Sequence, residues 1–412
     1  MSAKTTIYWC ILLAILYGSL ELCSAMGFRI LQATRHVDYS PFPPALIETQ
    51  HKEQLQKLIA GQTKYSIYSR ELGWTIKPNG RSPLESANSQ GIRADRDYSL
   101  RPPPGKIRIA AFGDSFTHGD QVANSDTWEE ALGRQDPQLE LLNFGVGGYG
   151  LDQALLRYLK DGLAYRPDIV FIGYMSEDIS RHINTFRPFT QPLTGMPLTK
   201  PRFLLEGEKL VLAPNPVQDV EQYRSLLENP QAILKQLGQH DVRYQHAYEP
   251  GPLDFLPSIQ LAKQFIQFCR YPEDALFTDR EYNLDSEAYQ VTERIFDEFV
   301  KAALKRHALP IIIIFPNRSD LRDYRRNGSR EYAPLLRHFD KQGYLYIDAL
   351  HAFEGDAAKL ELDEIFAGHY TPLGNKLVGM HVHGFLATQD LLNRAALQKQ
   401  VTRLRHQDVE NY

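Results

Sequence analysis

Short apolar runs recur along the chain from residue 105 onward, and segments with helical periodicity separate them. Residues 107–112, 139–144 and 169–173 have the pattern of strands that are buried on both faces of a parallel sheet. Residues 311–315 and 344–348 predict a fourth and a fifth strand. Because parallel strands are joined by crossover helices, the sequence predicts a three-layer α/β/α fold around a five-stranded parallel sheet.

Three segments between and after these strands predict the covering helices. Residues 151–163 place apolar side chains at four-residue spacing, which is typical of an amphipathic helix. Residues 286–307 predict a long helix, and a final helix should begin at about Pro372, because Thr371 is a good N-cap and proline suits the first helical position. The apolar positions of the first helix are Leu151, Leu155, Leu159 and Leu163.

Two long segments interrupt this alternation. The first is an N-terminal extension, in which residues 65–76 predict a strand or two, so we expect it to pack on the main domain. The second is too long for a loop and should be an insertion with its own structure, including a hairpin at 203–212. The predicted organisation is a leader at 1–26, the extension at 27–104, the main domain at 105–185 and 289–390, the insertion at 186–288, and a C-terminal tail at 391–412.

The N-terminus resembles an export signal. Lys4 precedes an apolar run at residues 7–20, and the small residues Ser24 and Ala25 follow it. If the segment is not cleaved, residues 7–22 would anchor the protein as a short membrane span, and a buried first helix is the alternative. We therefore expect an exported protein, periplasmic or otherwise extracytoplasmic, either secreted or anchored to the membrane.

Composition narrows the choice of partners and cofactors. The 412 residues carry a formal net charge of −4 without a basic run, which argues against a nucleic-acid partner. Of the three cysteines, only Cys269 lies beyond the N-terminal segment, so we expect no internal disulfide in the mature chain and a buried thiol. No cysteine–histidine spacing indicates zinc, and we expect neither a metal nor another cofactor.

The first candidate for chemistry follows the first strand, at Gly113-Asp114-Ser115. In an open α/β sheet, ligands bind at the carboxyl ends of the strands. A serine at that edge and at the start of a helix has backbone N–H groups nearby that can stabilise a developing negative charge. The same residues also suit an ordinary turn with an N-cap, so this segment alone leaves both interpretations open.

Two later segments favour the chemical interpretation. The glycines within residues 145–150 follow the second strand and let the backbone approach a ligand closely. The P-loop pattern is absent there, and an oxyanion donor fits better than a nucleotide site. His369 lies in the loop just before the last predicted helix. The competing candidates for a general base are His118, His182 and His351.

Together these segments resemble the conserved blocks of the SGNH (GDSL-type) hydrolase and acyltransferase superfamily. Gly113-Asp114-Ser115 resembles the first block, Asn143-x-Gly-x-x-Gly148 the second, and His369 followed by Thr-Pro-Leu-Gly-Asn the last. The resemblance implies a flavodoxin-like fold, with Ser115 as nucleophile and His369 as general base. It also implies that the backbone N–H groups of Ser115 and Gly148 bind the oxyanion.

The resemblance covers residues of about 105–185 and 290–390. Upstream of it, residues 72–79 and 88–93 resemble the leader of membrane-associated members that act on surface polysaccharides. This part of the resemblance implies a carbohydrate substrate.

The chain departs from the family's pattern at two positions. Glu177 occupies the slot of an asparagine whose amide would donate to the oxyanion, and an ionised carboxylate cannot donate. Losing one such donor typically costs about 2.7–4 kcal/mol, unless Glu177 is protonated by burial or points away with Ser176 in its place. Phe366 occupies the usual position of the triad aspartate. Asp363 is the first candidate for the acid, and the alternatives are Glu364, Asp348 or a dyad without an acid.

These observations predict a serine esterase or O-acyltransferase that acts on O-acyl groups, acetyl above all, of a carbohydrate or another small ester. The alternative is a catalytically silent relative that binds a polysaccharide or a protein partner, which Glu177 and the absent aspartate favour. Three residues after the third strand either meet a polar substrate or form a solvated helix face: Arg181, His182 and Arg187.

Overall fold

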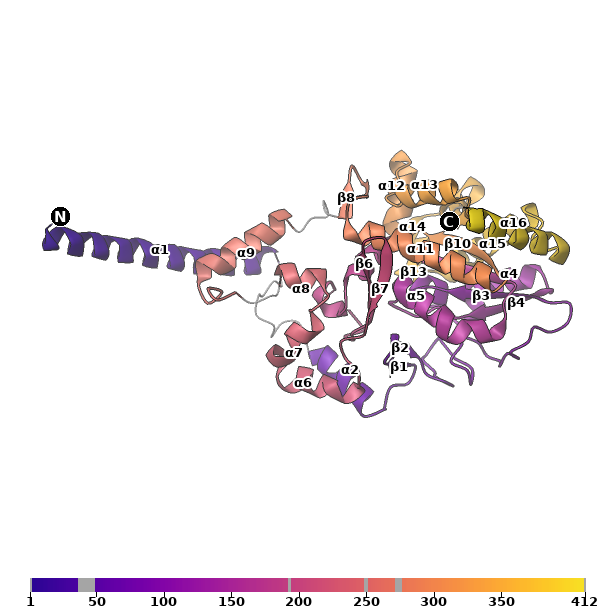
Figure 1. Cartoon of the computed structure of the whole chain (residues 1–412), viewed down its shortest axis with the longest axis horizontal. Coiled ribbons are helices and arrows are strands. Elements are labelled where there is room, and N and C mark those ends of the chain that lie inside the picture. Colours follow the sequence, from indigo (N-terminus) through magenta and orange to yellow (C-terminus); the bar gives the residue numbers. More distant parts are fainter. Residues whose placement is uncertain (1, 36–48, 192–193, 248–250, 271–275, 411–412) are drawn as a thin grey trace.

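A five-stranded parallel sheet forms the centre of the computed structural model, which describes residues 2–35, 49–191, 194–247, 251–270 and 276–410 (Figure 1). The strand order is β11-β10-β5-β3-β4, the doubly wound order of flavodoxin-like sheets. The predicted three-layer fold is confirmed. The strands are β3 (Ile107–Phe112), β4 (Leu139–Asn143), β5 (Ile169–Met175), β10 (Leu309–Phe315) and β11 (Tyr346–Asp348).

The four longer strands have no exposed or half-buried residue, which explains why they appear in the sequence as continuous apolar runs. Successive side chains point to opposite helical layers. On β5, the Phe171 ring lies 5.8 Å from Trp128 on one side, whereas the Tyr174 ring lies 5.3 Å from Phe296 on the other. Both layers are therefore anchored on the same strand.

Helices cover both faces of the sheet. Helices α4 (Trp128–Gln135) and α15 (Pro372–Thr388) pack together on one face. Helices α5 (Leu151–Arg157), α11 (Glu287–Lys305) and α13 (Ala333–Gln342) lie on the other, where the Phe296 and Phe339 rings are 4.9 Å apart. The main domain also contains α3 (Ser115–His118), α12 (Arg318–Asn327) and α14 (Leu362–Ile365).

The predicted start positions of α11 and α15 are confirmed. Ser286 caps α11, and Thr371 caps α15 by accepting from the Gly374 N–H. The predicted helix at 151–163 is wrong in extent: the α-helix ends at Arg157, a π turn and a 3₁₀ turn follow, and Leu159 is 44% exposed. Four-residue spacing overestimated this helix because its last two apolar positions do not share one buried face.

The expectation that the helix at Pro372 is the last one is also wrong. Residues predicted as a tail include helix α16 (Arg394–Glu410), which packs against α11 and β10 and buries Leu397, Val401 and Leu404. Arg394 donates to Asp168 Oδ1 at 3.0 Å, next to the start of β5. The C-terminal segment is thus part of the main core.

The extension and the insertion share a second hydrophobic cluster. The extension contributes the hairpin β1 (Ser66–Ser69) with β2 (Gly73–Ile76), as predicted, and helix α2 (Thr49–Ile59). The insertion contributes the predicted hairpin, β6 (Arg202–Glu206) with β7 (Lys209–Ala213). The remaining elements of the insertion are α6 (Tyr223–Glu228), α7 (Pro230–Leu237), α8 (Val242–Ala247), α9 (Pro257–Arg270), β8 (Phe277–Thr278) and β9 (Glu281–Tyr282).

This second cluster reaches the main domain through the glycine loop. Trp74 and Leu72 of the extension, Tyr223 of the insertion, and Val146 and Tyr149 of the loop are all buried in it. The two long segments are therefore packed against the loop that follows β4.

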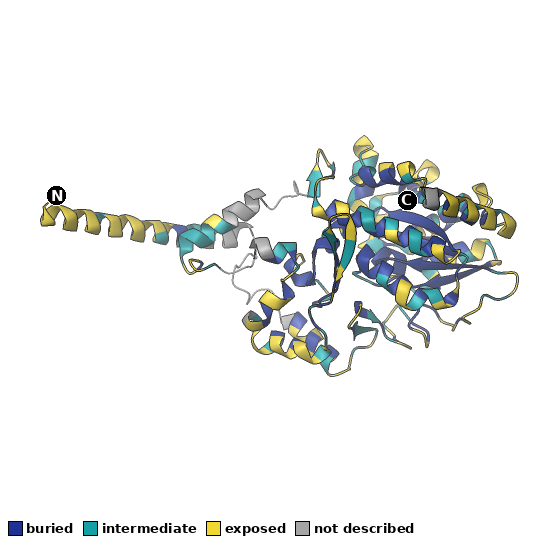
Figure 2. Cartoon of the chain, in the orientation of Figure 1, coloured by how far each residue is buried: buried dark blue, intermediate teal, exposed yellow. Residues whose placement is uncertain are grey.

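Helix α1 (Ala3–Arg35) projects away from the main domain and is exposed along most of its length (Figures 1 and 2). Residues 3–30 are long and apolar enough to cross a membrane by length and composition, so the span exceeds the short run expected from the sequence. Its Glu21 carboxylate accepts from the Ser258 N–H of α9 at 2.9 Å. The side chain of Cys269, expected to be buried, lies outside the described residues.

Candidate active site

Ser115 is the first residue of α3, directly after β3, and it is 5% exposed. Asp114 is the N-cap of this helix: its Oδ1 accepts from Phe116 N–H at 2.9 Å and from Thr117 N–H at 3.4 Å. The Ser115 hydroxyl lies 3.5 Å from Asp114 Oδ2, a weak contact at most. The N-cap interpretation of this turn is thus confirmed for Asp114, and the reactive role of Ser115 stays a prediction.

The glycine loop lies against α3. A Cβ on Gly145 would fall 2.3 Å from the His118 backbone nitrogen, so only glycine permits this approach. Gly148 has φ +77°, in the left-handed region that favours glycine. Among the described residues, neither the Ser115 N–H nor the Gly148 N–H donates to another backbone group. Two donors are thereby left available beside the nucleophile.

The N-terminal extension supports both of these segments from behind, a role that the sequence did not indicate. Trp74 Nε1 donates to Gly147 O at 3.0 Å, and Tyr149 OH donates to Trp74 O at 2.6 Å. Arg93 Nη1 donates to His118 O at 2.6 Å, at the end of α3. Segments 72–79 and 88–93 therefore hold the glycine loop and the end of α3 in place.

His369 lies on β13 (His369–Tyr370), which forms a tight hairpin with β12 (Phe366–Ala367). Its ring centroid is 5.1 Å from that of Phe116, the residue after the nucleophile. Its backbone N–H donates to Gln121 Oε1 at 3.0 Å. The structure thus places Ser115 and His369 at the same rim of the sheet, and Gln121 ties the two segments together.

The imidazole of His369 has no acidic partner at its buried Nδ1, which has no hydrogen-bond partner in the described part of the chain. Asp363, the first candidate from the sequence, is wrong for this role: its side chain is 85% exposed and its Oδ1 lies 2.6 Å from Arg318 Nη1. Glu364 accepts from the Glu361 N–H at 2.8 Å as part of a capping box. Asp348 accepts from Tyr332 OH at 2.9 Å. This geometry fits a Ser–His dyad.

Glu177 does not serve the oxyanion hole as a donor. It is exposed, and its Oε1 accepts from Asn317 Nδ2 at 3.1 Å. Ser176 does not replace it, because its hydroxyl is buried and donates to Asp320 Oδ2 at 2.7 Å. Two backbone donors are therefore what this site offers, and the side-chain donor of the family is missing.

A buried charge cluster lies behind the nucleophile. Arg181 Nη1 donates to Tyr149 O at 2.6 Å, lies 3.7 Å from Asp114 Oδ2, and forms an ion pair with Asp178. Burial raises the pKa of Asp114, against the effect of the Arg181 charge, and it raises the pKa of Asp178 well above the ordinary range. Arg181 thus links the carbonyl after Gly148 to the carboxyl before Ser115.

The solvated-face interpretation of the segment after β5 is wrong, since Arg181, His182 and Arg187 are all buried. His182 accepts from the Leu151 N–H at 3.0 Å and so caps α5. Burial and the nearby Arg181 charge lower the pKa of Arg187 to about 9. These residues are internal to the fold because counter-charges and helix ends satisfy them.

The remaining histidines have other partners. His118 Nε2 lies 2.7 Å from Tyr65 OH, and its Nδ1 contacts Asp120. Glu85, His118 and Asp120 could hold a metal ion by spacing, but the Arg93 guanidinium lies 3.2 Å from His118 Nδ1 and would repel a cation. His351 is exposed and pairs with Glu354 at 3.0 Å, so neither histidine replaces His369.

A family model matches part of this architecture. Residues 111–264 match the GDSL-like lipase/acylhydrolase family, a segment that contains Ser115, Gly148 and the start of the insertion but ends before His369. No curated protein matches the chain.

Several solved structures are similar to the chain at low identity. A putative lipolytic protein of the G-D-S-L family from Desulfitobacterium hafniense is 15% identical and covers 68% of this chain and 99% of its own, with a TM-score of 0.34. A lipase/acylhydrolase from Enterococcus faecalis is 13% identical, covering 68% and 94%, with a TM-score of 0.32. A catalytic mutant of an acetylxylan esterase from Geobacillus stearothermophilus is 13% identical, covering 69% and 94%, with a TM-score of 0.35. Similarity at this level says nothing about the substrate of this chain.

Proposed function

Through residues 111–264 the chain belongs to the GDSL-like lipase/acylhydrolase family of ester-hydrolysing enzymes, and we propose that it is a serine esterase that cleaves or transfers O-acyl groups through an acyl-enzyme. The observation that carries the proposal is the grouping at one rim of the sheet. Ser115 begins α3, two backbone N–H groups beside it are available, and the His369 ring packs on the residue after the nucleophile.

In the proposed first step, Ser115 Oγ attacks the ester carbonyl while His369 accepts the hydroxyl proton. The carbonyl oxygen becomes an oxyanion, and the N–H groups of Ser115 and Gly148 donate to it. Collapse of this intermediate breaks the ester bond, and His369 returns the proton to the leaving alkoxide. Water or a sugar hydroxyl then attacks the acyl-enzyme with His369 as base, which releases Ser115.

The absence of an acid at His369 Nδ1 sets the expected efficiency. Because no hydrogen-bond acceptor among the described residues holds Nδ1 and fixes the tautomer, turnover should fall below that of a full triad. The Arg181–Asp114 link offsets part of this loss by holding the oxyanion loop in place before substrate binds. We therefore expect a slow esterase.

The test is active-site labelling with a fluorophosphonate probe together with hydrolysis of p-nitrophenyl acetate. Wild type should be labelled and turn over the ester, and Ser115→Ala should lose both. Ser125→Ala is the matched control, because Ser125 is exposed and lies outside α3. A folded wild type with neither labelling nor turnover would favour the silent polysaccharide- or protein-binding alternative.

The acyl group and the acceptor are a finer part of the same proposal. We propose that the substrates are acetyl esters of a carbohydrate, and this part rests on the resemblance of the leader alone. We also propose an extracytoplasmic location, with which the apolar helix α1 is compatible. Acetyl, butyryl and octanoyl p-nitrophenyl esters compared with acetylated oligosaccharides separate a carbohydrate esterase from a lipase. Preference for octanoyl esters would contradict the carbohydrate assignment without affecting the acyl-enzyme.

A further inference from the structure

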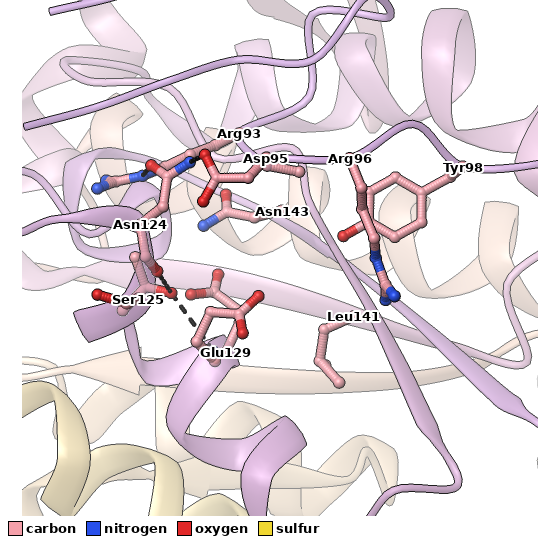
Figure 3. Close-up of a pocket in the computed structure, with 12 residues that line it drawn as sticks. Arg93, Asp95, Arg96, Tyr98, Asn124, Ser125, Glu129, Leu141 and Asn143 are labelled. Carbon is pink, nitrogen blue, oxygen red and sulfur yellow. Dashed lines mark hydrogen bonds between the residues drawn. The ribbon is translucent and has the colours of Figure 1, made fainter.

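A cavity of about 370 Å³ lies between the extension and the edge of the sheet (Figure 3). Its walls come from residues 93–98 of the extension, residues 124–130 around the start of α4, and Leu141 and Asn143 of β4. None of the proposed catalytic residues lines it. It is large enough for a small organic molecule, at the low end of the range for ligand pockets.

Glu129 contributes a buried carboxylate without hydrogen-bond partners to the lining of this cavity. It is the second residue of α4 and is 2% exposed, and neither carboxylate oxygen has a hydrogen-bond partner in the described residues. Figure 3 shows its side chain among the lining groups, between Ser125 and Leu141 in that view. A buried carboxylate without a partner is strongly unfavourable, so the site requires either a proton or a donor.

The donors around Glu129 are already used by other acceptors. The five that matter are Arg93 Nε to Asn124 Oδ1 at 3.1 Å, Arg93 Nη2 to Val122 O at 2.6 Å, Asn124 Nδ2 to Ser86 O at 3.0 Å, Asn143 Nδ2 to Thr117 O at 3.1 Å, and Thr127 Oγ1 to Asn124 O at 3.3 Å. Arg96 is exposed and lies over the Tyr98 ring at 5.2 Å. Apart from the exposed Arg96 and Ser125, the donors of the lining are therefore engaged by acceptors other than Glu129.

We propose that this cavity binds a small molecule with a primary ammonium group, which donates hydrogen bonds to the Glu129 carboxylate. An ammonium supplies both the donors and the charge that the site lacks. The lining holds three carboxylates against two guanidinium groups, so its formal charge favours a cation. Leu141 and Ala94 offer apolar surface to the carbon skeleton of such a ligand.

Proton linkage gives the proposal a second readout. Burial raises the pKa of Glu129 well above its ordinary value, although its own backbone N–H and Arg93 act in the opposite direction. An empty cavity therefore holds a protonated Glu129 at low pH, and an ammonium ligand must displace that proton. Apparent affinity should rise with pH until the pH exceeds the raised pKa, and binding should release protons.

The test is titration calorimetry of the full-length chain with diaminobutane as the probe and butanediol as its neutral analogue. Wild type should bind the diamine at least about tenfold more tightly than the diol, and Glu129→Gln should lose at least about tenfold in diamine affinity. Glu298→Gln, at an exposed position of α11 outside the cavity lining, is the matched control and should stay within about twofold. Heats measured in two buffers of different protonation enthalpy should differ for wild type and for this control, but not for Glu129→Gln.

Three results would overturn the proposal: no diamine binding by folded wild type at millimolar concentration, equal diamine binding by Glu129→Gln, or equal binding of diol and diamine. Thermal unfolding of each variant confirms that it is folded. If Glu129→Gln does not fold, Glu129→Asp, which withdraws the carboxylate by one methylene, takes its place with the same expectation.

Discussion

Replacing Asp363 with asparagine should leave ester hydrolysis within about twofold of wild type, because the structure places this carboxylate on Arg318 and away from the imidazole. The side chain is 85% exposed, whereas a triad acid is buried and bonded to the histidine. The His369 Nδ1 that such an acid would occupy is buried and has no partner within the described residues. The change should therefore remove a surface ion pair and nothing else.

The two possible magnitudes are far apart. Removing a working triad aspartate lowers kcat by about 10⁴, which corresponds to about 5.5 kcal/mol of barrier. An exposed arginine–carboxylate pair contributes about 0–1 kcal/mol, and that contribution concerns stability more than catalysis. A kinetic measurement with an error of a few tens of per cent separates these outcomes without ambiguity.

The assay is steady-state hydrolysis of p-nitrophenyl acetate over a range of pH, with Ser115→Ala as the background to subtract. Arg318→Gln is the matched control, since it breaks the same ion pair from its other side. The reasoning is refuted if Asp363→Asn lowers kcat by more than about a hundredfold while Arg318→Gln keeps its activity. That pattern would mean that Asp363 turns onto the imidazole when substrate binds.

Three further predictions concern the oxyanion loop and one buried ion pair. Gly148→Ala should lower the free energy of unfolding by about 1–2 kcal/mol and reduce kcat, because φ +77° disfavours a residue with a side chain. The added Cβ itself would make only an ordinary contact, 3.6 Å from Trp74. An unchanged kcat would contradict this prediction. Trp74→Phe should reduce kcat by about tenfold or less through loss of the bond to the loop carbonyl, with KM nearly unchanged; a KM effect alone would point to substrate contact. His338 lies 2.8 Å from both Glu293 and Asp297, and although burial acts to lower it, these carboxylates raise the pKa of His338 to about 9. The contribution of the charged His338 to the free energy of unfolding is therefore complete below about pH 6.5 and is lost as the pH rises to about 9. The pKa difference alone corresponds to at most about 3 kcal/mol, and solvent screening reduces the expected loss to about 1–2 kcal/mol. Urea titrations of His338→Gln should lack that part of the pH dependence.

The sheet was predictable because its central strands are buried on both faces, which leaves continuous apolar runs in the sequence. The strand ends were less so: β5 continues through Met175 and β11 begins only at Tyr346, since the preceding Tyr344 N–H closes helix α13 on Phe339 O. The tail was misread because α16 buries only a sparse set of apolar residues, and no local pattern shows that they meet α11.

The turn residues of the candidate site could be predicted from the sequence, whereas the side-chain contacts between segments far apart in the chain could not. Gly113-Asp114-Ser115 and the glycines after β4 act through their own backbone, so their type and order carry the information. The choice of Asp363 rested on nearness in sequence to His369, but the short helix α14 turns that carboxylate toward Arg318 instead. Spacing along the chain does not determine which way a side chain leaves a helix.

The burial of Arg181 also could not be predicted from the sequence, because it depends on contacts between distant segments. A polar residue soon after a strand reads as solvent-facing, yet Asp178 and Asp114, from two different strand ends, supply the charges that make its burial possible. The consequence is functional, because this guanidinium also binds the carbonyl of Tyr149. A contact between residues far apart in the sequence thus holds the loop that carries one of the proposed oxyanion donors.

The N-terminal extension also contacts both the glycine loop and α3. Its Trp74 donates to the carbonyl of Gly147 and its Arg93 donates to the carbonyl of His118, which ends α3, so the extension supports both segments that carry the proposed oxyanion donors. Because Trp74 also belongs to the cluster shared with the insertion, loosening that cluster should disturb the oxyanion hole before it disturbs the sheet. Activity would then be lost at milder denaturant than the main unfolding transition, and coincident loss of the two would show that the extension and the sheet unfold as one unit.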